Sequence, residues 1–214
     1  MINQMNNKYV QYGCGWYPHN APKSWRNFDA SPTLRLERIP ILGRFNRKNE
    51  TRFPQNVEYG DIVHGLPLTD NSCKGVYCAH VLEHLSLEDF RKAVRNSHKI
   101  LEPGGTFRFV VPDLEYYIQK YISDPTYESA MNFMQNTILG KEKRNRNIKE
   151  FVIEWIGNSQ HLWMWDYKSL RHELGQAGFF EIRRAKFADS VDPMFAEIEF
   201  WERWENCLGI ECKK

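Results

Sequence analysis

The chain has 214 residues, of which 42% are hydrophobic and 26% are charged. These values are ordinary for a globular protein, and the length suits one domain over residues 1–214 rather than two independent cores. The formal net charge of only +2 lacks the clustered basic excess of proteins that bind nucleic acid backbones, so we expect no nucleic-acid partner.

Short β-type runs alternate with helical patterns in the first half of the chain, which is typical of a parallel α/β sheet. Strands are expected at residues 9–12, 25–28, 57–59, 75–79 and 106–111. A helix is expected to begin after Ser86, and Pro103-Gly104-Gly105 is expected to stop it before the fifth strand. Only about ten residues, Pro18 and Pro22 among them, separate Gly15 from Trp25, so a standard crossover helix is not expected there.

The second half of the chain begins with a mostly helical pattern at residues 114–156. Asp166 is predicted to cap a further helix, which Gly178 ends. Strands are expected at residues 179–187 and 195–201, and the second of these is expected to be the last strand of the sheet.

Cysteine usage and the N-terminal residues give no indication of export. The five cysteines form no C-x-x-C pair, and residues 1–8 lack the apolar segment of a signal peptide. No apolar run approaches the roughly 18 residues of a membrane span. We therefore expect reduced thiols, no transmembrane segment and a cytoplasmic location. The basic stretches 44–52 and 141–149 are interpreted as solvated loops, with anion binding as the alternative.

Glycines and carboxylates follow three consecutive predicted strands. Gly13 and Gly15 follow the first, Asp29 follows the second, and Asp61 with Ile62 follows the third. In an open α/β sheet, ligands bind at the carboxyl ends of the strands. Glycines let the backbone approach a ligand closely, Asp29 can accept hydrogen bonds from ribose hydroxyls, and Asp61 with Ile62 offers an acceptor and an apolar face to adenine. Aspartates are also common in turns, but their coincidence with the glycine turn predicts a nucleoside pocket.

Five segments, in this order, resemble class I S-adenosylmethionine-dependent methyltransferases over about residues 8–113. They are Y-V-Q-Y-G-C-G, N-F-D-A-S-P, Y-G-D-I-V-H-G-L-P-L-T-D-N-S, V-Y-C-A-H-V-L-E-H-L and I-L-E-P-G-G-T-F-R-F-V-V-P-D. The later H-L-W-M-W-D-Y-K-S-L and D-P-M-F-A-E-I-E are similar to the C-terminal part of a small subgroup, like methyltransferase type 11. The resemblance implies a Rossmann-like, doubly wound α/β fold with a seven-stranded, mostly parallel sheet whose last strand is antiparallel.

The same resemblance implies S-adenosylmethionine as the cofactor and S-adenosylhomocysteine as its product. Gly13 and Gly15 would then lie under the methionine portion, Asp29 would hold the ribose, and Asp61 with Ile62 would hold the adenine. His80, at the end of the fourth strand, would also lie close to the cofactor.

His161, His84 and Asp113 are the predicted catalytic residues. His161 precedes a helix cap, and a structural role in the core is the equal alternative for it. Asp113 follows the fifth strand and can also serve as the N-cap of the next helix. His80-Val81-Leu82-Glu83-His84 fits the H-x-x-E-H zinc pattern. Because His80 closes a strand instead of sharing a helix face with His84, we expect no metal.

The segment V-L-E-H follows the fourth strand. A D/N-P-P-Y motif at this position would resemble methyltransferases that act on amino groups, and the chain does not have it there. Together with the low net charge, this favours O-methylation of a small-molecule or sugar acceptor, under a helical cap formed by residues 114–165. One alternative is a catalytically inactive S-adenosylmethionine-binding partner or regulatory module. Another is a different enzyme of the same fold that uses a nucleoside or dinucleotide. The sequence leaves the acceptor and the oligomeric state open.

Overall fold

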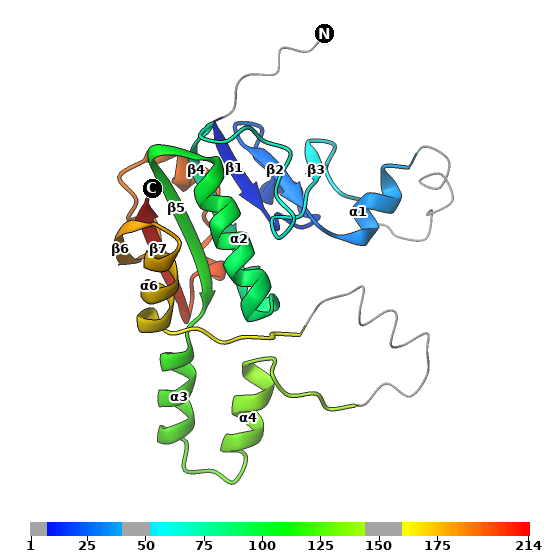
Figure 1. Cartoon of the computed structure of the whole chain (residues 1–214). Helices are drawn as coiled ribbons and strands as arrows, with labels where there is room; N and C mark the ends of the chain where they lie inside the picture. The colour runs from blue at the N-terminus through cyan, green and yellow to red at the C-terminus, as the bar shows by residue number, and fades with distance from the viewer. Residues whose placement is uncertain (1–7, 40–51, 144–159) are drawn as a thin grey trace.

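The computed structural model describes residues 8–39, 52–143 and 160–214, which form a seven-stranded sheet with helices around it (Figure 1). The strands are β1 (Tyr9–Tyr12), β2 (Arg26–Asp29), β3 (Val57–Tyr59), β4 (Cys73–Ala79), β5 (Leu101–Pro112), β6 (Phe180–Ala185) and β7 (Cys207–Lys213). The α-helices are α1 (Pro32–Glu37), α2 (Leu87–Ile100), α3 (Leu114–Ser123), α4 (Ser129–Asn136) and α6 (Tyr167–Gln176). Short 3₁₀ helices are η1 (Pro18–Asn20), η3 (Leu82–His84), η4 (Pro193–Glu197) and η5 (Trp201–Arg203).

The strand order is β3-β2-β1-β4-β5-β7-β6. The pairs β1·β2, β2·β3, β1·β4 and β4·β5 are parallel, whereas β7 runs antiparallel to both β5 and β6. This mostly parallel arrangement confirms the Rossmann-like fold expected from the sequence. The strand order reverses direction between β1 and β4, and ligands of such sheets bind in the crevice outside the carboxyl ends at that point.

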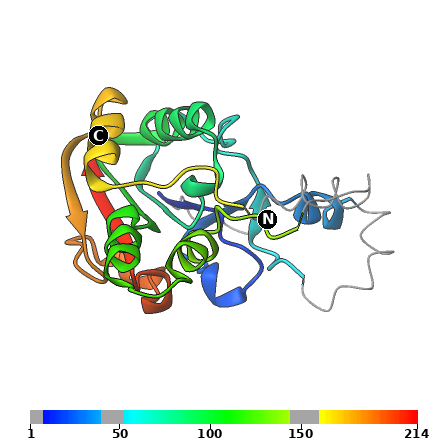
Figure 2. The same cartoon turned by 90° about the horizontal axis from the view of Figure 1, so that it is seen from below.

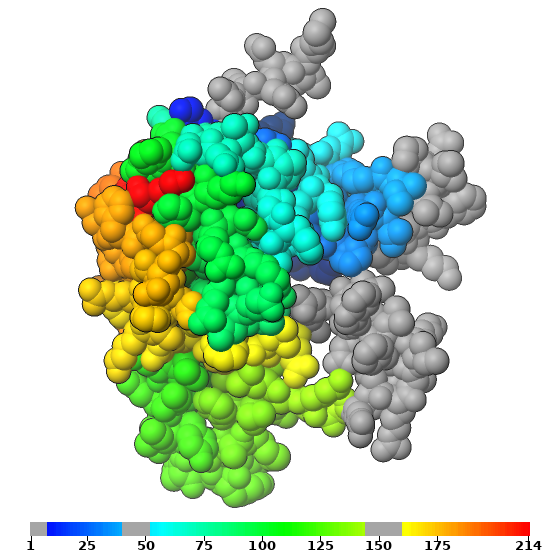
Figure 3. All heavy atoms as spheres, in the orientation of Figure 1, coloured from blue at the N-terminus to red at the C-terminus, as the bar shows by residue number. Residues whose placement is uncertain are grey.

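Apolar side chains pack on both faces of the sheet, because successive strand residues point to opposite sides. Val76 and Cys78 of β4 belong to one cluster with Phe90 of α2 and Leu170 of α6. Tyr77 and Ala79, the alternate residues, belong to a second cluster with side chains of the 193–205 segment. Helices α2 and α6 thus cover one face (Figures 1 and 3). An irregular segment with the two 3₁₀ turns η4 and η5 covers the other.

The expected strand at residues 195–201 is wrong, because η4 and η5 occupy this part of the chain and the last strand is β7. The Asp192 side chain accepts a hydrogen bond from the Met194 N–H at 3.1 Å, which starts a helical turn instead of a strand. Phe195 and Ile198 are both buried in the same cluster. Their spacing of three residues is therefore helical, although the local sequence resembles an alternating strand.

The only helical element in the connection between β1 and β2 is the short η1. The prediction that no crossover helix lies there is confirmed. Buried amides hold this connection in place. The Gln11 side chain donates to the Asn20 carbonyl and, at 2.5 Å, to the Asn27 side-chain oxygen. The Asn27 amide nitrogen donates in turn to the carbonyls of Trp25 and Pro22 at 2.9 and 3.0 Å. Side chains of β1 and β2 thus organise this loop, which takes the place of the usual crossover helix.

The predicted helix after Ser86 is confirmed as α2, whose N-cap Ser86 hydroxyl accepts the Asp89 N–H. Its end differs from the prediction, because β5 already begins at Leu101 and contains Pro103-Gly104-Gly105. The helix predicted after Asp166 is confirmed as α6, and Asp166 forms a capping box with Ser169.

The region predicted to be helical from residue 114 contains α3 and α4, joined by a short turn. Residues 144–156 of that region lie outside the described residues, as do positions 44–51 and 144–149 of the two basic stretches. Helices α3 and α4 extend beyond the carboxyl edge of the sheet (Figures 1 and 2). Within the described ranges, we find no helix with the length and apolar character that crossing a membrane requires.

Candidate active site

The carboxyl edge of the parallel strands collects residues that lie far apart in the sequence. Because β1 to β5 run parallel, Gly13, Asp29, Asp61, His80 and Asp113 all follow or end strands on this edge. The structure thus places most of the predicted site residues along one side of the molecule, which Figure 2 views from below.

The loop after β1 is attached to the end of β2 by the Asp29 carboxylate. One carboxylate oxygen accepts the Gly15 N–H at 2.9 Å, and the other accepts the Ser31 N–H at 2.8 Å. Asp29 is 9% exposed, and burial raises its pKa although both backbone hydrogen bonds lower it. Each carboxylate oxygen has a second lone pair. The side chain is therefore oriented by the protein and can still accept hydrogen bonds from a ligand's hydroxyl groups.

Gly13 and Gly15 have φ angles of +70° and +68°, a region that favours glycine. A Cβ atom on Gly13 would lie 2.2 Å from Cγ2 of Val81, which follows β4. The loop thus runs directly against the first residues after β4. Gly15 instead borders open space, since a Cβ atom there would meet no atom within 4 Å.

We expect Gly13→Ala to weaken S-adenosylhomocysteine binding by about tenfold or more, because the left-handed backbone alone costs about 1–2 kcal/mol and the methyl group displaces Val81. Calorimetric titration measures the affinity, and urea unfolding measures the stability. Gly104→Ala is the matched control, since Gly104 also has a positive φ, of +81°, but a Cβ there meets no atom within 4 Å. Equal effects of the two substitutions on affinity would contradict a role of Gly13 in the cofactor site.

Asp61 begins a tight turn after β3. Its carboxylate accepts the Val63 N–H at 2.9 Å and lies 2.7 Å from Nδ1 of the exposed His64. Ile62 is 5% exposed and belongs to the main apolar cluster, and its carbonyl accepts a hydrogen bond from Asn96 at 2.7 Å. Asp61 therefore has the structural role of a turn residue and is also placed at the ligand edge, whereas most of the Ile62 side chain packs inward.

His80 lies directly after β4 with a φ of +57°, which is rare outside glycine and common at functional sites. Its Nε2 is 3.0 Å from the Arg203 carbonyl oxygen, and its Nδ1 is 3.2 Å from Oε1 of Glu83. Burial lowers the pKa of His80, but hydrogen bonds to the Cys207 sulfur and the Glu83 carboxylate outweigh it and raise the pKa to about 10. Because both ring nitrogens face acceptors, these contacts favour the protonated form of His80.

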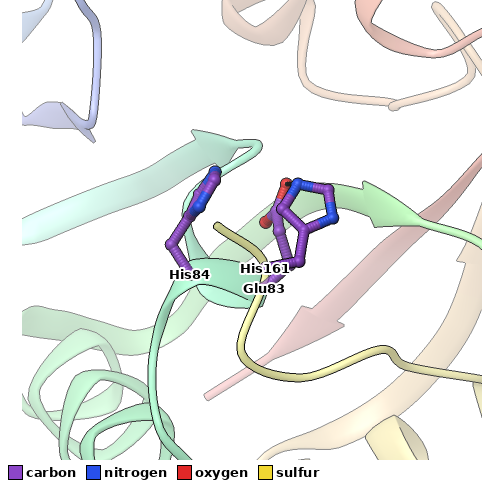
Figure 4. A group of neighbouring side chains, drawn as sticks. All are labelled: Glu83, His84 and His161. Atoms are coloured by element: carbon purple, nitrogen blue, oxygen red, sulfur yellow. Dashed lines mark ion pairs between the residues drawn. The ribbon is translucent and has the colours of Figure 1, made fainter. Parts of the chain in front are cut away.

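Glu83, His84 and His161 lie together where η3 meets the segment that precedes α6 (Figure 4). The Glu83 carbonyl accepts the N–H groups of Leu162 and Trp163 at 2.8 and 3.1 Å, which joins these two parts of the chain. The rings of His84 and His161 meet edge to face, with centroids 4.8 Å apart. Burial lowers the pKa of His161, which favours the neutral imidazole.

Glu83 is the functional candidate that sequence reasoning missed. It is completely buried; its Oε1 lies 3.2 Å from Nδ1 of His80, and its Oε2 has no hydrogen-bond partner among the described residues. The only available signal was its position inside the H-V-L-E-H segment.

Asp113 is the N-cap of α3, where its carboxylate accepts the Glu115 N–H at 2.9 Å and lies 3.6 Å from Arg184. The structure therefore brings His84 and His161 together and places Asp113 at the adjacent strand end.

The sheet order and this edge define a class I methyltransferase fold. Residues 29–109 match a family model described as a methyltransferase domain, whereas no curated protein matches the sequence. An S-adenosylmethionine-dependent methyltransferase from Thermotoga maritima, described as a possible histamine N-methyltransferase, is similar at 14% identity and a TM-score of 0.52, over 96% of this chain and 81% of that one. An Archaeoglobus fulgidus S-adenosylmethionine-dependent methyltransferase is similar at 16% identity and a TM-score of 0.50, over 96% of this chain and 85% of that one.

Residues 29–109 carry a methyltransferase domain, and the fold of the chain is that of class I S-adenosylmethionine-dependent methyltransferases. The protein is a methyltransferase, and its cofactor is S-adenosylmethionine. The open space beside Gly15 and the oriented carboxylate of Asp29 fit a ligand that carries a ribose.

Proposed function

We propose that this enzyme methylates a hydroxyl oxygen of a small molecule or sugar. The observation that carries the proposal is the group of His84 and His161 beside the buried Glu83, directly after β4. A hydroxyl acceptor must lose its proton when its oxygen is methylated, and imidazoles next to a carboxylate suit that transfer.

In this proposal the cofactor lies along the carboxyl edge, across the end of β1. Gly13 and Gly15 approach its methionine portion, and the Asp29 carboxylate accepts hydrogen bonds from the ribose hydroxyls. Asp61 accepts a hydrogen bond from the adenine amino group, with the accessible edge of Ile62 beside the ring. His80 orients Glu83 near the cofactor through their 3.2 Å contact.

Residues 114–165 are proposed to cover the acceptor, as an insertion within one domain over residues 1–214. The described part of this range includes α3 and α4, which extend past the carboxyl edge (Figure 1). Asp113 begins α3, so we place it where the acceptor enters, between the edge of the sheet and this cap.

When bound, the cofactor supplies a methyl group that its positive sulfur has already activated. The main task of the chain is therefore to align the acceptor oxygen, and good alignment accounts for about 7–11 kcal/mol of barrier. A general base contributes about 10²–10⁴-fold in addition. His161 is the proposed base, because its Nε2 lies 4.0 Å from the Glu83 carboxylate and burial, which lowers its pKa, favours the neutral imidazole.

Incubation with methyl-labelled cofactor and separate pools of sugars, small hydroxylated compounds and nucleic acids tests the proposal. We expect label on a small hydroxylated product, with one S-adenosylhomocysteine released per label. His161→Ala is expected to lower turnover by about 10²–10⁴-fold with little change in S-adenosylhomocysteine affinity. The control His172→Ala removes an exposed histidine of α6 and should leave turnover unchanged.

Label that appears on nucleic acid alone would contradict this choice of acceptor. Tight S-adenosylhomocysteine binding without label in any pool would instead favour an inactive cofactor-binding partner subunit. The two outcomes are distinguishable, because the second leaves the cofactor site intact.

A further inference from the structure

The side chains of Glu83, His84 and His161 have the composition and spacing of a metal-binding set. One donor atom from each lies within 4.8 Å of the other two, and Figure 4 shows the three side chains grouped together. Two imidazoles and one carboxylate suit divalent transition metals. Ligand atoms around an ion with bonds of about 2.1 Å lie up to roughly 4.2 Å apart. Small side-chain rotations are therefore enough to close the set around an ion.

Buried polar atoms without partners provide a second observation. Oε2 of Glu83 and Nδ1 of His161 are buried without a hydrogen-bond partner in the described part of the chain, and the two residues are 0% and 6% exposed. The ion pair with His80 lies on the Oε1 side of the carboxylate. Leaving several buried polar atoms unpaired is costly. A cation between Glu83 and the imidazoles would satisfy them together.

The outer contacts of this group provide a third observation. Nδ1 of His84 lies 3.1 Å from the Gln160 carbonyl oxygen, so Nδ1 is the donor and Nε2 is the ring nitrogen left to face an ion. His80 holds the Glu83 carboxylate from the opposite side. Metal-bound histidines typically donate their second N–H to a carbonyl, and metal-bound carboxylates are themselves hydrogen-bonded.

We propose that Glu83, His84 and His161 together bind one divalent transition-metal ion at the carboxyl end of β4. From the sequence we expected no metal, because His80 and His84, the two histidines of the H-x-x-E-H pattern, do not share a helix face. In the structure His80 turns toward the Arg203 carbonyl, and His161 supplies the second imidazole. A ligand from a distant part of the chain thus completes a set that the local motif does not provide.

The role of this ion in catalysis rests on the proposed O-methylation. A hydroxyl group bound to a divalent cation loses its proton more easily than a free one. The acceptor proton leaves to solvent, and the alkoxide oxygen attacks the methyl carbon. The new C–O bond forms as the C–S bond breaks, and the electron pair of that bond goes to sulfur, which yields S-adenosylhomocysteine. In this scheme His161 acts as a ligand, so the ion replaces it as the means of activating the hydroxyl.

Co²⁺ titration of the whole, chelator-treated chain tests the site without cofactor or acceptor. Visible absorption bands report Co²⁺ coordination, and we expect one ion per chain. His84→Ala and His161→Ala should each weaken binding by about 100-fold or more, because even an outer partner of a metal site contributes about 10–100-fold. His172→Ala, the exposed control on α6, should bind Co²⁺ like the unmodified chain.

Glu83→Gln is a further variant that keeps the size of the buried side chain but removes its charge. We expect it to lose the Co²⁺ absorption bands. Circular dichroism melting of each metal-free variant shows which ones remain folded, and His84, which is half-buried, tolerates truncation best. Absence of Co²⁺ bands in the unmodified chain, or bands that persist in folded His84→Ala and His161→Ala, would overturn the site. Because no methyl transfer is measured, failure of this site and failure of the proposed function are separate results.

Discussion

Replacing Asp29 by alanine is expected to weaken S-adenosylhomocysteine binding by about 100-fold or more. The carboxylate is nearly buried and accepts the N–H groups of Gly15 and Ser31. Its removal takes away the acceptor for the ribose hydroxyls and releases the glycine loop. A hydrogen bond to a charged group contributes about 1.5–3 kcal/mol, and two such bonds correspond to at least about a 100-fold change in affinity.

Calorimetric titration with S-adenosylhomocysteine measures this effect. Asp29→Asn keeps one acceptor oxygen and should give an intermediate affinity. Asp70→Ala is the control, because Asp70 is an exposed aspartate whose carboxylate lies 3.5 Å from Lys99. An Asp29→Ala chain that remains folded and binds as tightly as the unmodified chain would remove Asp29 from the cofactor site.

Arg108→Ala is expected to cause the largest loss of stability, about 3–5 kcal/mol in the free energy of unfolding. The guanidinium is fully buried in β5, bonds to Glu199, and lies 3.0 Å from both Asp189 and Glu211. It also stacks on Trp204, with the guanidinium carbon Cζ 4.6 Å from the ring centroid. Alanine would leave the buried carboxylates of Glu199 and Glu211 without this cation, which is why the cost exceeds that of an exposed pair.

Urea unfolding followed by circular dichroism provides the measurement. Arg108→Lys keeps the charge but not the fork of donors, so an intermediate loss is expected. Arg91→Ala is the control, because Arg91 forms a two-point contact with Glu173 on the surface, and its midpoint should barely move. If Arg108→Ala and Arg91→Ala shifted the midpoint equally, the buried network would have no special role in stability.

Local patterns were sufficient to predict the parallel half of the fold. Residues 9–12 and 57–59 form strands with the predicted bounds, and the caps at Ser86 and Asp166 start helices as expected. These features depend on neighbouring residues and on short-range hydrogen bonds. The end of the sheet was mispredicted because Phe195 and Ile198 are both apolar and because the turn at Asp192 depends on one side-chain contact.

The candidate site shows the same division between local and distant information. The positions of Gly13, Asp29 and Asp61 at strand ends followed from the sequence, because each depends on one strand and the residue after it. The contact between Glu83 and His161 did not, since it needs a segment more distant in the chain to fold back over η3. The partners of Arg108 likewise come from residues 186–211, which no local pattern connects with β5.

The placement of β7 has a consequence for how the chain folds as it is synthesised. The strands β1 to β5 pair with one another within residues 9–112, whereas β6 has only β7 as a partner among the described strands. Because N-terminal parts of a chain are made first, one side of β5 stays open as a sheet edge until β7 arrives. Inward-pointing charges discourage pairing at such edges. Arg108, before its carboxylate partners are made, would therefore protect the half-formed sheet from aggregation.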